Sequence, residues 1–250
     1  DDFIGKRKIS NFENKKKIVL GSGVRFINNP PSINPSWDIR FLRGPLSALA
    51  LKQNPKNFIT DPAYLVREMP FFSRLVKTKK HKISLMPHFL SVEKFDWANI
   101  CKKFNINYIN PSEKNIEKVL QEVNDTEFLI TEAMHGAIIA DTLRVPWKRF
   151  KCFSYLHESE MVSEFKWSDW LFSMNLDHSF YDLNYNKLVK QFDKKIDIPF
   201  LTSFRTKNID KQIENLIESE NYQLSKDSLL TDKVSALLEQ IVLLKKQQSN

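Results

Sequence analysis

Residues 127–153 read EFLITEAMHGAIIADTLRVPWKRFKCF, and this stretch decides the fold class. Its first five residues, 127–131, contain the apolar run 128–130 and predict a strand. Residues 136–144 predict an apolar helix that Pro146 ends, and residues 147–153 predict a second strand. Because strand, helix and strand follow one another directly, the stretch indicates a β-α-β unit and therefore a parallel sheet in an α/β protein.

The same alternation extends outward from this unit over most of the chain. Two helices are expected between Ile209 and Lys246, around Ser225, because leucine and isoleucine recur there at helical spacing. The remaining strands are expected at 17–20, 38–43, 57–60, 82–86 and 106–109, and the remaining helices at 46–51, 92–104 and 112–123, the last with Ser112 as N-cap.

The pattern divides the chain into three expected regions. Residues 1–75 form a first half, 76–200 a second half and 201–250 a pair of C-terminal helices. The boundary is placed near residue 75 because Pro70 ends a helix and a lysine-rich lead-in precedes the cleaner alternation. Since the chain does not begin with methionine, we expect residues to be missing before Asp1.

Composition excludes several classes of protein. In 250 residues, 42% are hydrophobic and 27% charged, which is typical of a folded globular chain. Neither a run of about 18 apolar residues nor a secretory signal is present. The two cysteines, Cys101 and Cys152, are too few for a disulfide framework or a structural zinc site. We therefore expect no metal and a cytoplasmic location, either free or at the inner face of the membrane.

The formal net charge of +8 raises the question of an anionic partner. The lysines are scattered, and no zinc-finger, ribonucleoprotein or basic-zipper motif accompanies them, so we expect no nucleic acid. A small anionic substrate, an acidic polysaccharide or an anionic membrane face would be attracted equally well.

Glycine is rare, and four of the five glycines follow predicted strands: Gly21, Gly23, Gly44 and Gly136. The carboxyl edge of a parallel sheet is where ligands bind, and helix N-termini there favour anions. Gly21-Ser22-Gly23 lacks the third glycine of a dinucleotide fingerprint, so a tight turn is its simpler interpretation and a phosphate contact the alternative.

Charged and imidazole side chains accompany these glycines. Arg43 precedes Gly44 and can present a planar fork to phosphate or carboxylate, or it can be a salt-bridged surface residue. His135 begins an apolar helix, with Glu132 placed to orient its ring or share its proton; a capping role is the alternative. His88 follows another strand and is the second candidate histidine.

An ordered set of motifs is similar to one family. Its order and spacing over about residues 17–175 resemble the polysaccharide pyruvyl transferase family, and within it the exopolysaccharide enzymes related to the succinoglycan pyruvyl transferase. The motifs stand at residues 18–24, 37–48, 60–63, 84–88, 132–141, 144–147 and 166–170.

The resemblance implies a glycosyltransferase-B-like architecture, in which two Rossmann-like halves with parallel sheets face a cleft, followed by the C-terminal helices. It implies phosphoenolpyruvate as donor substrate, with no further cofactor. The acceptor would be a glycan or lipid-linked saccharide of a surface polysaccharide, the product a pyruvate ketal, and a peripheral association with the membrane would fit that acceptor.

The resemblance also implies roles for individual residues. Arg43 and His135 match donor-binding positions of the family, and Lys166 is the best match for a later lysine, although from position alone it reads as a surface lysine. Many relatives carry Ser-Arg-Leu-His where this chain has Glu132-Ala133-Met134-His135. Either Arg144 or Lys148 replaces the absent arginine, or the donor is held differently.

Together these residues suggest a mechanism. Arg43 and Lys166 bind the phosphate and carboxylate of the donor, beside Gly21, Ser22, Gly44 and Gly136. His135 is the first choice for the general acid and Glu132 the next, and His88 assists as a base or as a phosphate contact. A nucleotide-sugar glycosyltransferase and a non-catalytic binding relative of the same fold are the alternatives.

Overall fold

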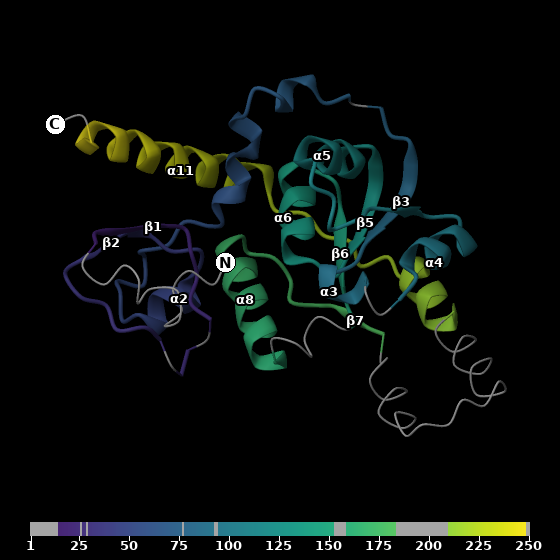
Figure 1. Cartoon of the computed structure of the whole chain (residues 1–250), viewed down its shortest axis with the longest axis horizontal. Helices are drawn as coiled ribbons and strands as arrows, with labels where there is room; N and C mark the ends of the chain where they lie inside the picture. The colour runs from purple at the N-terminus through teal and green to yellow at the C-terminus, as the bar shows by residue number, and fades with distance from the viewer. Residues whose placement is uncertain are drawn as a thin grey trace. The chain divides into compact units, whose positions relative to one another are not determined.

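The computed structural model describes residues 15–25, 27–28, 30–76, 78–92, 95–152, 159–183 and 210–248. They divide into two compact units, each assembled from separate stretches of chain (Figure 1). The first unit holds the described residues up to Phe72, then 159–178 and those from Ser225 onward. The second holds the described residues within 73–152 and 179–224. The first junction therefore follows Phe72, and a later helix returns to the first unit.

A five-stranded sheet with the order β4-β3-β5-β6-β7 forms the centre of the second unit. Every neighbouring pair is parallel, so the parallel sheet expected from the β-α-β pattern is confirmed. The strands are β3 (His81–Met86), β4 (Asn107–Tyr108), β5 (Thr126–Thr131), β6 (Trp147–Lys151) and β7 (Tyr181–Asp182).

Helices cover both faces of this sheet. On one face, Leu85, Ile130 and Phe150 form a core with α4 (Trp97–Lys103) and a helix over residues 210–218. On the other face lies α6 (Met134–Thr142), whose Gly136 packs directly over Thr131 and Met86. A Cβ on Gly136 would stand 2.6 Å from the Thr131 Oγ1, so the close packing of α6 requires glycine there.

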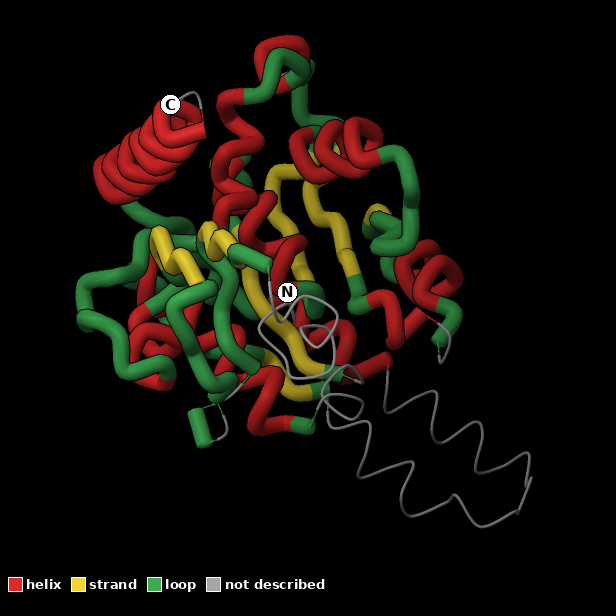
Figure 2. The backbone as a smooth tube through the Cα atoms, turned by 60° about the vertical axis from the view of Figure 1, so that its left-hand side comes forward, coloured by secondary structure: helices red, strands yellow, loops and turns green. Residues whose placement is uncertain are grey.

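The first unit is built around a parallel pair of strands, β1 (Lys17–Leu20) and β2 (Trp37–Phe41), which are drawn in yellow in Figure 2. Its core contains Val19, Leu42, Ala48 and Leu51. The helices of this unit are α2 (Pro45–Ala50), the 3₁₀ helix η2 (Pro62–Glu68), α8 (Glu160–Ser173) and α11 (Asp227–Gln248), and a short 3₁₀ helix, η3 (Phe72–Arg74), follows η2.

Polar bonds fasten α8 to the earlier part of the first unit. The hydroxyls of Thr60 and Ser173 are 2.9 Å apart, and the indole N–H of Trp170 donates to the Tyr64 hydroxyl at 3.3 Å. All four side chains are buried. Because buried polar groups need partners, these bonds fix one face of α8 against the unit.

Three sequence-based predictions differ from the structure in detail. The helix expected over 92–104 is replaced by α3 (Phe89–Val92) and α4, because the Asp96 carboxylate caps α4 by accepting from the Asn99 N–H at 3.1 Å. Residue 115, not 112, caps α5 (Ile116–Asn124), since the Asn115 side chain accepts from the Lys118 N–H. The strand expected at 57–60 is a single bridge to Leu42.

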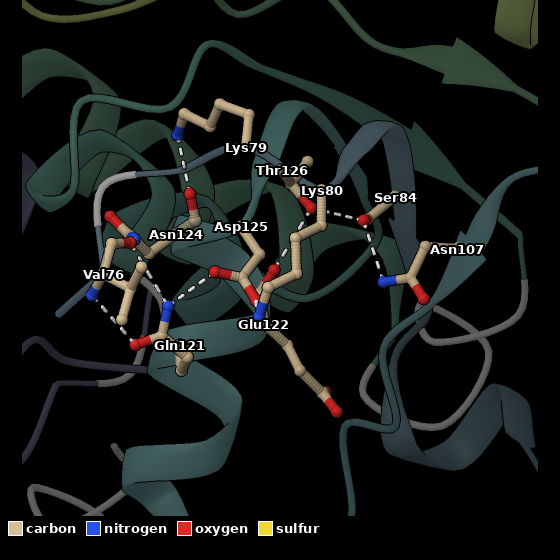
Figure 3. A network of polar contacts seen from close by, with 10 residues as sticks. All are labelled: Val76, Lys79, Lys80, Ser84, Asn107, Gln121, Glu122, Asn124, Asp125 and Thr126. Atoms are coloured by element: carbon tan, nitrogen blue, oxygen red, sulfur yellow. Dashed lines mark hydrogen bonds and ion pairs between the residues drawn. The ribbon is translucent and has the colours of Figure 1, made fainter.

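A polar network holds the lead-in to β3 at the amino end of the sheet (Figure 3). Lys79 Nζ donates to the Asn124 carbonyl at 2.7 Å, and Lys80 Nζ to Asp125 Oδ2 at 2.7 Å. The Gln121 side chain meets both the N–H and the carbonyl of Val76. These contacts fix where β3 begins, at the edge opposite the strand ends that carry the candidate site residues.

Among the described helices, none combines the length and apolar composition needed to cross a bilayer.

Candidate functional site

In the first unit, the loop of Gly21 and Gly23 approaches other side chains closely. Gly21 has φ 76°, and a Cβ there would stand 2.5 Å from the Pro62 ring. A Cβ on Gly23 would overlap Nη2 of Arg43. The first glycine thus supplies a left-handed turn, and the second allows the guanidinium to lie against the loop.

Arg43 is buried at the junction of β2 and α2, with 1% of its side chain exposed. Its Nε lies 3.6 Å from Asp169 Oδ2. Within the described part of the chain, neither Nε nor Nη2 of Arg43 makes a hydrogen bond. Such a guanidinium is neutralised by one carboxylate yet keeps donor capacity for a further acceptor.

Asp169, on α8, joins the separate parts of this unit. Its Oδ1 accepts from the Ser47 N–H at 2.9 Å and its Oδ2 from the Ser47 hydroxyl at 2.6 Å. The Ser47 hydroxyl in turn accepts from the Val24 N–H at 3.0 Å. Burial raises the pKa of Asp169, while Arg43 and Ser47 oppose that rise.

Two of the residues predicted from the sequence to bind the donor substrate, Arg43 and Gly44, lie directly against Asp169. Gly44 packs against the Asp169 backbone so closely that a Cβ would overlap its carbonyl oxygen. Ser22 belongs to the glycine loop and accepts from the Arg43 N–H at 3.4 Å through its carbonyl. Lys166 lies on α8, three residues before Asp169, and is half-buried. Sequence reasoning did not select Asp169, although it stands inside the motif at residues 166–170.

In the second unit, Glu132 is a buried carboxylate that connects the ends of three strands. Its Oε2 accepts from the His88 N–H at 3.0 Å and from the Ser91 hydroxyl, and its Oε1 from the Cys152 N–H at 3.2 Å. The donors follow β3 and β6, whereas Glu132 follows β5. Because the two carboxylate oxygens accept all three bonds, Glu132 ties together the residues that follow these three strands.

His88 lies after β3, half-buried, with its ring 4.5 Å from that of Phe89. Its Nδ1 accepts from the Leu90 N–H at 3.3 Å, an assignment that places the proton of the neutral ring on Nε2.

His135 is exposed at the second position of α6, immediately before the buried Gly136. The turn that precedes it is rigid, because the Thr131 hydroxyl bonds both the N–H and the carbonyl of Ala133, each at 3.1 Å. The imidazole is therefore presented from a fixed backbone at the carboxyl end of β5.

Neither proposed replacement for the absent arginine lies at this turn. Arg144 follows the opposite end of α6, where its Nη1 donates to the Asp141 carbonyl at 3.2 Å. Lys148 faces the other side of the sheet: its Nζ donates to the Ser219 hydroxyl at 3.0 Å and lies 4.2 Å from the Tyr222 ring. Burial lowers the pKa of Lys148 to about 8. Both residues complete helix ends instead.

Among the described residues, no group of three or more histidine, cysteine, aspartate or glutamate side chains is placed to hold a metal ion.

Comparison of the sequence with known proteins shows which family the chain belongs to. The family described as polysaccharide pyruvyl transferase matches residues 3–147, more than half of the chain. The chain is 37% identical over 155 residues to the succinoglycan biosynthesis protein ExoV of Rhizobium meliloti (strain 1021). That alignment covers 62% of this chain and 46% of the relative, so it spans about half of the relative's length. No solved structure matches. The family match confirms the resemblance read from the motifs: the chain belongs to the polysaccharide pyruvyl transferase family.

Proposed function

We propose that the protein transfers a pyruvyl group from phosphoenolpyruvate to a sugar of a bacterial surface polysaccharide, forming a pyruvate ketal. Family membership supports pyruvyl transfer, and a relative named for succinoglycan biosynthesis supports a polysaccharide acceptor. The observation that carries the proposal is Arg43, a buried guanidinium against a glycine loop with two nitrogens that make no hydrogen bond among the described residues.

The first unit would bind the donor's anionic groups. A guanidinium presents paired N–H groups to phosphate or carboxylate, and burial strengthens such a bond. Lys166, on the helix that also carries Asp169, would supply a second positive charge. Gly21, Ser22 and Gly44 would let the donor approach the backbone beside Arg43.

The second unit would supply proton transfer. Ketal formation requires protonation of the enol methylene, which leaves a cationic centre on the neighbouring carbon. A sugar hydroxyl attacks that carbon and loses its proton. Phosphate then leaves with its bonding electron pair, which restores a cationic centre on the same carbon. A second hydroxyl adds to that centre and loses its proton, and this closes the ketal ring. His135 is the proposed general acid, and His88 the proposed base or phosphate contact. Glu132 would hold His88 in place, and Gly136 would keep the first turn of α6 close to β5.

The same proposal includes the arrangement of the two halves and the place of the protein in the cell. Parallel strands in both units support a glycosyltransferase-B-like arrangement of two Rossmann-like halves. A lipid-linked saccharide as acceptor would bring the protein to the inner face of the membrane, where a net charge of +8 favours anionic lipid.

Calorimetric titration with phosphoenolpyruvate tests the proposal. The wild type should bind saturably, and Arg43→Lys, which keeps the charge but loses the fork, should bind about 10- to 100-fold more weakly. Arg40→Lys is the matched control, because Arg40 lies on β2, three residues before Arg43, and its guanidinium already donates to Asp38 at 2.7 Å.

Binding of a nucleotide sugar in place of phosphoenolpyruvate would overturn the proposal in favour of a glycosyltransferase. Binding of neither, by protein that is folded, would favour a non-catalytic relative.

A further inference from the structure

Phe89 is a large aromatic side chain that the fold leaves exposed at the carboxyl edge of the second unit's sheet. It is the first residue of α3, labelled in Figure 1, and it follows the last residue of β3 by three positions. Phe89 is 54% exposed, whereas the other three residues of α3 are buried or half-buried. The exposed apolar surface of α3 is therefore that of one aromatic ring, at the edge where parallel sheets bind ligands.

The backbone on both sides of Phe89 is held by hydrogen bonds. Before it, the His88 N–H donates to Glu132 Oε2 at 3.0 Å. After it, the Ser91 hydroxyl donates to the same oxygen, and the Ser91 carbonyl accepts from the Trp97 indole N–H at 3.2 Å. The Ser91 N–H also donates to the His88 carbonyl at 2.8 Å. Because the backbone that carries the ring is fixed, a ligand that lies on the ring loses little free energy to ordering it.

The phenyl ring of Phe89 and the imidazole of His88 lie next to each other. Their centroids are 4.5 Å apart, and their planes are inclined by 37°. The imidazole is itself oriented, because its Nδ1 accepts from the Leu90 N–H at 3.3 Å. A ligand that covers Phe89 therefore comes within reach of the histidine already considered as a base.

We propose that Phe89 is a stacking platform for one sugar ring of the acceptor. A pyranose ring has an apolar face of C–H groups, whose partial positive charge suits the negative face of an aromatic ring. Its hydroxyls lie around the rim, so a pyranose that stacks on Phe89 brings hydroxyls beside His88. The identification of this sugar as the pyruvyl acceptor rests on the proposed function, whereas the platform itself does not.

The size of the exposed surface favours a small ligand over a protein partner. A stable protein interface buries about 1,200 Å² or more in total, whereas α3 exposes a single aromatic ring. A saccharide also matches the mixture of groups, because the apolar ring of Phe89 stands beside an imidazole that can hydrogen-bond hydroxyl groups.

Saturation-transfer NMR with methyl β-D-glucopyranoside and methyl β-D-galactopyranoside tests the platform without any pyruvyl transfer. We expect saturation to reach the ring C–H protons of at least one sugar in the wild type and in Phe89→Tyr, which keeps an aromatic face. Phe89→Ala should weaken this binding about 10-fold. Phe172→Ala is the matched control and should bind as the wild type does. Phe172 is 52% exposed and its ring centroid lies 4.4 Å from that of His178, but it belongs to the first unit.

Three outcomes would overturn the platform. The first is an absence of saturation transfer to both sugars in the wild type, and the second is equal binding by the wild type and Phe89→Ala. The third is an equal loss of binding in Phe172→Ala, which would indicate unspecific contact with exposed phenyl rings. Octyl β-D-glucopyranoside, kept below its micelle-forming concentration, tests another occupant. Saturation of its alkyl chain alone, lost in Phe89→Ala, would assign the ring to an apolar chain and refute the sugar platform.

Calorimetry with phosphoenolpyruvate separates this inference from the proposed function. If the wild type binds phosphoenolpyruvate and its contact with sugar does not depend on Phe89, the platform is wrong and the proposed function stands. If the wild type binds a sugar through Phe89 but does not bind phosphoenolpyruvate, the proposed function is refuted and the platform stands.

Discussion

Ser47 donates both its backbone N–H and its hydroxyl to the carboxylate of Asp169, a residue that follows it by 122 positions. The same carboxylate neutralises Arg43. One buried acid therefore fixes the start of α2, the adjacent guanidinium and the position of α8.

Replacement of Asp169 by asparagine should destabilise the protein by about 3–5 kcal/mol, because it leaves a buried guanidinium without its counter-charge. Urea unfolding measures the effect. Asp232→Asn, on the exposed side of α11, makes the same chemical change at the surface and should stay within about 0.5 kcal/mol of wild type. Equal effects of the two substitutions would show that the pair contributes little.

Addition of a methyl group at residue 23, by Gly23→Ala, should cost about 1–3 kcal/mol, because the new Cβ overlaps Nη2 of Arg43. A double-mutant cycle checks the cause. In the Arg43→Lys background, where Nη2 is absent, the cost of Gly23→Ala should be clearly smaller. An unchanged cost would mean that the backbone, not the guanidinium, resists the methyl group.

Lys148 should make the free energy of unfolding depend on pH in the alkaline range. Its pKa is about 8 in the folded protein and near its ordinary value of 10.5 when unfolded, so between these pH values the unfolded chain binds more protons. The free energy of unfolding contributed by this group therefore rises as pH increases from about 8 to 10.5. The measurement is the difference in unfolding free energy between wild type and Lys148→Met across this range. A flat difference would contradict the lowered pKa.

His135→Ala should reduce pyruvyl transfer by about 10²- to 10⁴-fold, the typical contribution of one proton-transfer group. Because His135 is exposed, its removal should leave stability within about 0.5 kcal/mol. His81→Ala, at the amino end of β3, is the control and should retain turnover. Near-normal turnover by His135→Ala would remove this histidine from the mechanism.

Local sequence pattern was sufficient for the parallel sheet of the second unit. Strand β5, helix α6 and strand β6 appear where the apolar runs and Pro146 predict them, because each depends on residues close in sequence. The glycines after β1 and β5 likewise stand where a side chain would collide with its neighbours. Such signals are local, and a single sequence carries them.

Contacts between distant segments could not be predicted in the same way. Nothing near Asp169 indicates that it meets Arg43, since the pairing depends on the return of α8 to the first unit. The burial of Arg149 and Lys151 was missed for a related reason: a strand with three cations in five residues resembles a surface strand until its neighbours on both faces are known.

The return of α8 also sets an order of events during synthesis on the ribosome. At roughly 5–20 residues per second, the 122 residues between Ser47 and Asp169 take roughly 6 to 24 seconds to emerge. For that interval the nascent first unit holds a guanidinium without its carboxylate and an α2 without its cap. Most strands of the second unit leave the ribosome meanwhile, so the segment around Arg43 and Ser47 is translated before the second unit yet completes its fold only after α8 has emerged.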